Sequence, residues 1–551
     1  MNRVVGASAS LIDGALSANG RVFLVNPNGV LFGAGAQVEV GGLVASTLAL
    51  RDADFLAGNF VFDGAGAGIV ANHGRIVTVG DGQGGFIAML AAQVVNEGTL
   101  QADRGSVALV AADRVTLDLG GLVGVTVERG SLAALVDNGG AIRADGGRVY
   151  LTARAADELA SAAINHDGVI EARTLVTGEK GSIILLGDLG HGSLVADGRL
   201  DASAPAGGDG GFIETSAAQL SFGPNFAVTT AAAQGAYGTW LLDPATIEIV
   251  AGSGGAVSGL PATGISQIGV TTISDALATA NVDLQATAAI DFLVDFNYAG
   301  ARDATLSLFA PTILLGGNIT TSTNKLGLNF GGTFNSTVYA GNLSVYGADR
   351  SIATRGGNVV FNGNLGGTYS LAVATAGGNI TTNALVNGTF SSLVPVTGTL
   401  SINYQAGGPT QVPGVIDFQT QTITINGGAP NQIGTGNVFP SGTVTFQAGT
   451  VFDLNASTNI NPVFTRPDGS TFSLVATSGG AVTFAATERV TRIDFYTKSS
   501  NWVTVTAANV TWKASASATA LNNLTLDAGS GTVTLNAPIT VAGNQIGRAH
   551  V

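Results

Sequence analysis

A repeating unit between residues 69 and 216 constrains the fold of this chain more than any other feature. Each copy of the unit carries a turn glycine, and the glycines are spaced by 24, 42, 28 and 30 residues, at Gly74, Gly98, Gly140, Gly168 and Gly198. Within a copy the apolar residues alternate with other residues, as in SVALVA at 106–111, a period that predicts strands. A repeat of this length built from short strands predicts a solenoid of stacked copies.

We therefore predict an all-β protein, a right-handed parallel β-helix. Asparagines recur in the repeat turns and are predicted to stack as a ladder of side-chain amides, at Asn72, Asn96, Asn138 and Asn165. The long step of 42 residues contains RVTLDLGGLVGVTVERG (114–130), which predicts a hairpin outside the β-helix. The segment 152–163 allows a short helix, but its place inside the repeat favours a strand and a corner.

Composition agrees with short strands joined by glycine and asparagine turns. The chain has 551 residues, 80 of them Gly, and only 11% are charged. Its net charge of −14 argues against a nucleic-acid partner, because the phosphate backbone attracts basic proteins. The absence of Cys excludes disulfides and thiolate metal sites. No apolar run reaches the ~18 residues that indicate a membrane-spanning helix.

The tetrapeptide at 26–29, Asn-Pro-Asn-Gly, lies between two runs that are predicted to be strands, 22–25 and 30–32. Pro27 fixes φ at the first central position of a tight turn, and Asn28 and Gly29 tolerate a left-handed backbone. The neighbouring Phe23 and Phe32 are predicted to lie in the core. Taken alone, this turn fits a hairpin or a corner in any β fold.

The longer stretch VFLVNPNGVLFGAGAQVEVGGLVAST (22–47) resembles the haemagglutination-activity domain of the filamentous haemagglutinin family, exoproteins of two-partner secretion. The resemblance covers roughly residues 2–244. It implies that Asn26, Pro27, Asn28 and Gly29 belong to the motif that addresses the protein to its partner. That partner would be an outer-membrane barrel with periplasmic domains. The resemblance further implies a secreted or cell-surface adhesin, which binds an unidentified host-cell or matrix receptor or glycan.

The resemblance and the changes of composition along the chain together give a domain plan. Residues 1–245 are expected to form the secretion-domain β-helix, without its first part and without a signal peptide. Residues 246–300 are a predicted linker with a short helix at 273–280, N-capped by Ser274. Residues 301–545 are a predicted β-repeat shaft rich in Thr, Asn and Gly. Residues 546–551 read as a translated sequencing adapter, so we expect a fragment truncated at both ends.

The polar side chains predict no catalytic, metal or cofactor site, and hence no enzyme. His73 and His166 are interpreted as solvated turn residues, and Asp103 and Asp145 as solvated corners. Two alternatives stay open. One is a β-helical carbohydrate-active enzyme, which needs acidic residues converging on one face. The other is the stalk of a contact-dependent toxin whose toxic part lies beyond Gln545.

Overall fold

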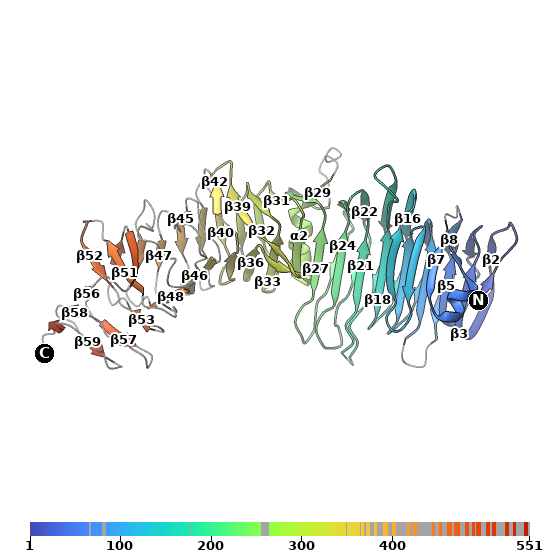
Figure 1. The fold of residues 1–551 in the computed structure, drawn as a ribbon, viewed down its shortest axis with the longest axis horizontal. Helices are drawn as coiled ribbons and strands as arrows, with labels where there is room; N and C mark the ends of the chain where they lie inside the picture. Colours follow the sequence, from blue (N-terminus) through green and yellow to red (C-terminus); the bar gives the residue numbers. More distant parts are fainter. Residues whose placement is uncertain are drawn as a thin grey trace. The chain divides into compact units, whose positions relative to one another are not determined.

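The computed structural model describes residues 1–363 except 65–67, 80–83, 177, 255–263 and 349, and beyond 363 it describes mainly individual strands. The chain divides into two compact units, residues 1–290 and residues 291–551. Nearly all of the regular structure is β-strand, and in the first unit the strands stack side by side along the chain (Figure 1). The predicted parallel β-helix is confirmed.

The first unit contains three columns of parallel strands, which we call column 1, column 2 and column 3. Column 1 is a separate eight-stranded sheet. Its strands are β2 (Ser10–Ile12), β4 (Val30–Phe32), β8 (Ile69–Asn72), β11 (Gln93–Asn96), β16 (Ala133–Asn138), β19 (Ser161–His166), β22 (Gly192–Ala196) and β25 (Gln219–Phe222).

Columns 2 and 3 are joined at their start by long strands. These are β3 (Ala15–Val25) and β5 (Gln37–Ser46), with β1 (Asn2–Arg3) beside β3. The first part of β5 pairs with column 2 and its last part with column 3. Column 2 continues as β9 (Arg75–Thr78), β12 (Thr99–Gln101), β17 (Ala141–Arg143), β20 (Val169–Glu171), β23 (Arg199–Asp201) and β26 (Ala227–Thr229).

Column 3 continues with strands of five or six residues. They are β10 (Phe86–Ala91), β13 (Ser106–Ala111), β18 (Arg148–Ala153), β21 (Ser182–Leu186), β24 (Phe212–Ser216), β27 (Thr239–Asp243) and β30 (Asn281–Gln285). Their register places one inward row in line, and all its members are fully buried: Ile87, Val107, Val149, Ile183, Ile213, Trp240 and Val282. Burial of each such side chain contributes about 1.5–3 kcal/mol, so the inward rows hold the stack together.

The predicted hairpin outside the β-helix is confirmed and is part of a larger element. Strands β14 (Arg114–Asp118) and β15 (Gly124–Arg129) are antiparallel. They form a four-stranded sheet with β7 (Phe60–Asp63) and β6 (Ala49–Leu50), and the short helix α1 (Asp52–Ala57) precedes β7. We call this the extra-helical sheet. Its apolar side chains pack against the outer side chains of β10 and β13. These two strands of column 3 are therefore buried on both faces.

Within the predicted linker, the chain forms β28 (Thr246–Val250), β29 (Ile265–Gly269) and the helix α2 (Val270–Thr279). The predicted helix is therefore present, but its predicted N-cap is wrong. The helix begins three residues earlier, with Gly269 at the N-cap, and Ser274 lies inside it. Apolar residues that face the stack, Ile273 and Leu277 among them, set the position of this helix. The segment 152–163 ends β18 and begins β19, as predicted.

The second unit continues with parallel columns. One contains β33 (Ala304–Phe309), β36 (Leu326–Phe330), β41 (Val359–Phe361), β44 (Ile380–Thr382), β46 (Thr399–Asn403), β48 (Thr422–Asn426) and β50 (Val451–Leu454). Another contains β32 (Phe296–Tyr298), β35 (Ile319–Thr321), β40 (Arg350–Ala353), β43 (Leu371–Ala374), β45 (Phe390–Val394), β47 (Ile416–Phe418) and β49 (Val444–Phe446). A third includes β31 (Ala289–Phe292), β34 (Thr312–Leu315), β39 (Asn342–Val345) and β42 (Leu365–Gly367).

Antiparallel pairs also occur in this unit. They involve β37 (Gly332–Phe334) and β38 (Thr337–Tyr339), then β51 (Ile460–Thr465) with β52 (Thr471–Ser473) and β55 (Arg492–Thr497), and β53 (Gly480–Thr483), β54 (Glu488–Val490) and β57 (Val510–Lys513). The remaining strands are β56 (Val503–Thr506), β58 (Leu524–Asp527), β59 (Val533–Leu535) and β60 (Gln545–Arg548). Residues 549–551 of the predicted adapter lie outside the described residues.

Candidate functional site

The Asn-Pro-Asn-Gly turn connects column 3 to column 1 and has a buried half and an exposed half. Asn26 and Gly29 are buried, whereas Pro27 and Asn28 are exposed. The Gly29 amide donates to the Asn26 carbonyl oxygen at 3.0 Å, which closes the turn. Gly29 has φ of +118°, a conformation that favours glycine. The predicted tight turn is confirmed, with the positive φ at Gly29.

The side chain of Asn26 fastens the turn to the segment that precedes it in the stack. Its Nδ2 atom donates to the Ser8 carbonyl oxygen at 3.0 Å and to Ser10 Oγ at 2.9 Å. Its Oδ1 atom accepts from the Asn28 amide at 3.0 Å, an Asx turn. Asn28 Nδ2 reaches back to the Gly6 carbonyl oxygen at 2.8 Å. The two asparagines thus order residues 6–10, and the exposed Pro27 lies between them.

The next layer of the stack fits closely against this turn. A Cβ atom on Gly68 would lie 2.7 Å from the Pro27 carbonyl oxygen and 2.6 Å from the Gly29 nitrogen. Phe23 and Phe32, on either side of the turn, are 3% and 0% exposed, as predicted for core residues. Phe23 belongs to the core under the extra-helical sheet and contacts the rings of Phe55 and Phe60. The turn is therefore held from both sides by packed layers.

The predicted amide ladder is confirmed for three asparagines and is wrong for the fourth. Asn72 Nδ2 donates to Asn96 Oδ1 at 2.8 Å, and Asn96 Nδ2 donates to Asn138 Oδ1 at 2.7 Å. The register then pairs Asn138 with His166, and Asn138 Nδ2 lies 3.1 Å from His166 Nδ1. Asn165 is an outward neighbour. His166 is fully buried, so its interpretation as a solvated turn residue is also wrong.

The ladder determines the charge and tautomer of His166. An amide N–H group from Asn138 requires an unprotonated Nδ1, which leaves the proton on Nε2, 3.4 Å from the Arg199 carbonyl oxygen. Burial lowers the pKa of His166. The imidazole is thus a neutral part of the polar ladder. His73, in contrast, is exposed as predicted, and its Nδ1 atom lies 2.7 Å from Glu97 Oε2.

The repeat glycines form a column two residues after the ladder positions. A Cβ atom on Gly98 would lie 2.1 Å from the Gly74 carbonyl oxygen, and the corresponding distances are 2.2, 2.0 and 2.2 Å for Gly140, Gly168 and Gly198. Each glycine carbonyl also accepts the amide hydrogen bond of the next layer, as Gly74 does from Thr99 at 2.8 Å. The repeat glycines are therefore required by close stacking of backbones.

The acidic corner of column 2 is an ion-paired cluster, which corrects the interpretation of Asp145 as solvated. Asp145 is 4% exposed, and Arg173 and Arg143 lie 3.0 Å and 2.9 Å from its Oδ2 atom. Burial alone would raise the pKa of Asp145, but the hydrogen bonds and charge of Arg173, with Arg143, lower it. Asp103 is half-buried and lies 3.2 Å from the Arg143 guanidinium. These carboxylates form ion pairs that stabilise the corner.

A second pair of carboxyl groups lies on the outer side of column 3. Burial, followed by the nearby charge of Glu214, raises the pKa of Asp243 to about 6. Burial also raises the pKa of Glu214. Glu214 Oε1 lies 2.9 Å from Ser216 Oγ, and Asp243 Oδ2 accepts from Gln285 Nε2 at 2.9 Å. Sequence reasoning missed this pair, because the register that aligns β24, β27 and β30 is not visible in the sequence.

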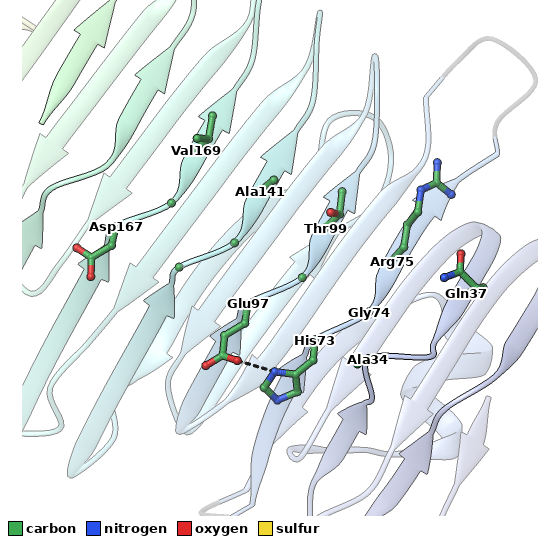
Figure 2. Close-up of a pocket in the computed structure, with 14 residues that line it drawn as sticks. Ala34, Gln37, His73, Gly74, Arg75, Glu97, Thr99, Ala141, Asp167 and Val169 are labelled. Carbon is green, nitrogen blue, oxygen red and sulfur yellow. Dashed lines mark hydrogen bonds and ion pairs between the residues drawn. The ribbon is translucent and has the colours of Figure 1, made fainter. Parts of the chain in front are cut away.

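A groove follows the glycine column along the corner between columns 1 and 2 (Figure 2). Its volume is about 620 Å³. One rim carries His73, Glu97 and Asp167, and the other carries Arg75, Thr99 and further residues that begin column 2. Among the residues that the structure describes, no group of three histidine or acidic side chains is placed to hold a metal ion. No helix in the described part is long and apolar enough to span a membrane.

Comparisons with known proteins concern mainly the first part of the chain. Residues 1–200 match the family model of the TPS secretion domain. A heme/hemopexin-binding protein of Haemophilus influenzae strain Rd is 32% identical over 196 residues, which cover 34% of this chain and 21% of that protein. Another heme/hemopexin-binding protein of Haemophilus influenzae is 56% identical over 46 residues, 8% of this chain and 5% of that protein.

One solved structure is also similar. The HMW1 secretion domain of Haemophilus influenzae aligns with 20% identity and a TM-score of 0.33, over 70% of this chain and 83% of that domain. The chain spans about a fifth or less of the length of the curated relatives it matches. Residues 1–200 are thus similar to the TPS secretion domain, a domain of two-partner secretion exoproteins. The comparisons do not single out the filamentous haemagglutinin family within that class.

Proposed function

We propose that this chain is exported through a dedicated outer-membrane barrel and that the Asn-Pro-Asn-Gly turn takes part in recognition by that partner. The match of residues 1–200 to the TPS secretion domain carries the proposal. The turn supports it, because Pro27 and Asn28 are exposed on a rigid base made by Asn26 and Gly29. The periplasmic domains of the barrel are the expected binding partner, and the destination is the medium or the cell surface.

The experiment compares an exposed asparagine of the turn, Asn28, with an exposed asparagine of another turn, Asn225. We expect Asn28→Ala, in the chain placed behind a secretory signal and produced with a two-partner barrel, to reduce export at least tenfold. The segment 223–226, Gly-Pro-Asn-Phe, provides a matched control, because Asn225 is also an exposed turn residue that bonds one neighbouring side chain, Asp197. Asn225→Ala should leave export unchanged. Equal export of the Asn28 variant and wild type would contradict the role of the turn.

We further propose that the exported protein is a non-catalytic adhesin. The repeat architecture that continues through β33, β36 and β41 supports an extended shaft, and the resemblance to haemagglutinins supports adhesion. The Glu214–Asp243 pair is the observation that favours the carbohydrate-active alternative, since glycosidases use a carboxyl group of raised pKa beside a second carboxyl group. Release of reducing ends from a polysaccharide by the wild type, but not by Asp243→Asn, would contradict the non-catalytic proposal.

A further inference from the structure

The groove along the glycine column has a floor without side chains. Its floor contains Gly74, Gly98, Gly140 and Gly168. A Cβ atom on each of these glycines would collide with backbone atoms of the preceding layer. Layers repeat about every 4.8 Å, so the three steps from Gly74 to Gly168 give a floor about 14 Å long. This length suits a short stretch of an extended chain that lies parallel to the stack.

One glycine in the groove is not explained by the fold. A Cβ atom on Gly139 would meet no atom within 4 Å, and its backbone lies outside the left-handed region. Gly139 occupies the rim position equivalent to Glu97 and Asp167, because the residues before them, Asn96, Asn138 and His166, are in register. The rim therefore has a gap about 10 Å wide between the layers of Glu97 and Asp167. The packing would accept a side chain there. Because Gly139 has none, the groove is open through this rim.

The polar groups on the two rims differ in chemistry. Glu97 and Asp167 offer only hydrogen-bond acceptors, Arg75 offers only donors, and Thr99 offers both. A cationic ligand would face the guanidinium, and an anionic ligand would face the two carboxylates. A hydroxyl group both donates and accepts, so a neutral polyhydroxyl chain can satisfy every one of these groups. Figure 2 shows the two rims running parallel along the successive layers.

We propose that this groove binds a short stretch of a neutral oligosaccharide, which enters beside Gly139. Glu97 and Asp167 accept hydrogen bonds from sugar hydroxyls, and Arg75 and Thr99 bind from the opposite rim. The ring faces rest on the glycine backbone. This inference rests on the proposed adhesin role and assigns the receptor chemistry to a folded surface of the secretion domain itself.

The test uses the full chain on an array of neutral, anionic and cationic glycans, with heparin and polylysine as charged probes. We expect at least one neutral oligosaccharide to bind the wild type. Gly139→Trp fills the gap without a steric conflict at Cβ and should weaken that binding at least tenfold. Gly121→Trp is the matched control, because Gly121 lies in the β14–β15 turn and its Cβ position is equally open. It should bind like the wild type.

Glu97→Gln provides a second variant, which keeps the size of the side chain and removes its charge. It should weaken binding several-fold while leaving circular dichroism unchanged. Binding of no neutral glycan, or equal binding by Gly139→Trp, would overturn the inference. Loss of heparin or polylysine binding in Gly139→Trp, with no neutral ligand, would assign the groove to a charged ligand instead. Export of these variants should remain normal, so a failure here is distinguishable from a failure of the export proposal.

Discussion

At the scale of single residues, the His166 side chain links the stability of the β-helix to pH. The imidazole must stay neutral to accept the hydrogen bond from Asn138, and burial lowers its pKa. The unfolded chain therefore binds more protons than the folded chain once the pH falls below about 6.5. The contribution of neutral His166 to the free energy of unfolding is complete above that pH. It decreases as the pH falls, with a limiting slope of about 1.4 kcal/mol per pH unit.

We expect His166→Asn to remove this contribution, because an asparagine amide does not titrate and matches the ladder residues before it. Urea unfolding at pH 7.5 and pH 5.5 measures the effect for both proteins. The difference between their pH dependences isolates His166 from Asp243, whose raised pKa acts in the opposite direction. An exposed-site control is His191→Asn. Equal pH dependence of His166→Asn and the wild type would show that the ladder imidazole carries no such linkage.

The position of His166 in the ladder also shows which sequence signal predicts the ladder residues. Asparagines recur near the turn glycines in the sequence, and residue identity alone predicts Asn165 as the fourth residue of the ladder. The spacing is the better signal, because Asn72, Asn96 and Asn138 each precede their glycine by two residues. Two residues before Gly168 is His166. In a stack held by backbone contacts, the glycine sets the register, and a different polar side chain then takes the ladder position.

At the scale of elements, the extra-helical sheet stabilises the β-helix through a second core. Phe62 is fully buried in that core, among side chains from β10, β13 and β14. We expect Phe62→Ala to lower the free energy of unfolding by about 3–5 kcal/mol, the usual cost of a buried Phe truncation. Leu122→Ala, at the exposed tip of the hairpin, should change it by no more than about 0.5 kcal/mol.

Hydrogen exchange distinguishes two results for Phe62→Ala. Faster exchange in β10 and β13 as well as in β14 and β15 would show one cooperative unit. Faster exchange in β14 and β15 alone, with an unchanged free energy of unfolding, would contradict the prediction and make the sheet a separable appendage. The sequence predicts the hairpin of this sheet from its alternation. It does not predict β6, α1 and β7, because these elements are short and β7 joins the sheet only by pairing with β14 across some 50 residues.

At the scale of the whole first unit, stacking makes stability a sum over neighbouring layers. The glycine column offers a way to weaken one contact between layers without touching the apolar core. A Cβ atom on Gly198 would lie 2.2 Å from the Gly168 carbonyl oxygen, so Gly198→Ala must separate those two layers. The layers before Gly168 keep their own inward row and the core under the extra-helical sheet.

We therefore expect Gly198→Ala to divide the stack unequally. Amides of β23, β26 and β27 should exchange at least tenfold faster, while those of β10 and β13 keep their protection. Gly139→Ala is the control, because its Cβ position is open, and it should leave exchange unchanged throughout. Uniform loss of protection from β10 to β27 would show that the unit unfolds as one body and that nearest-neighbour stacking does not describe it. Protection limited to the first layers would instead locate the most stable part of the chain beside the turn proposed to engage the export partner. That turn would then keep a folded base even when later layers are open.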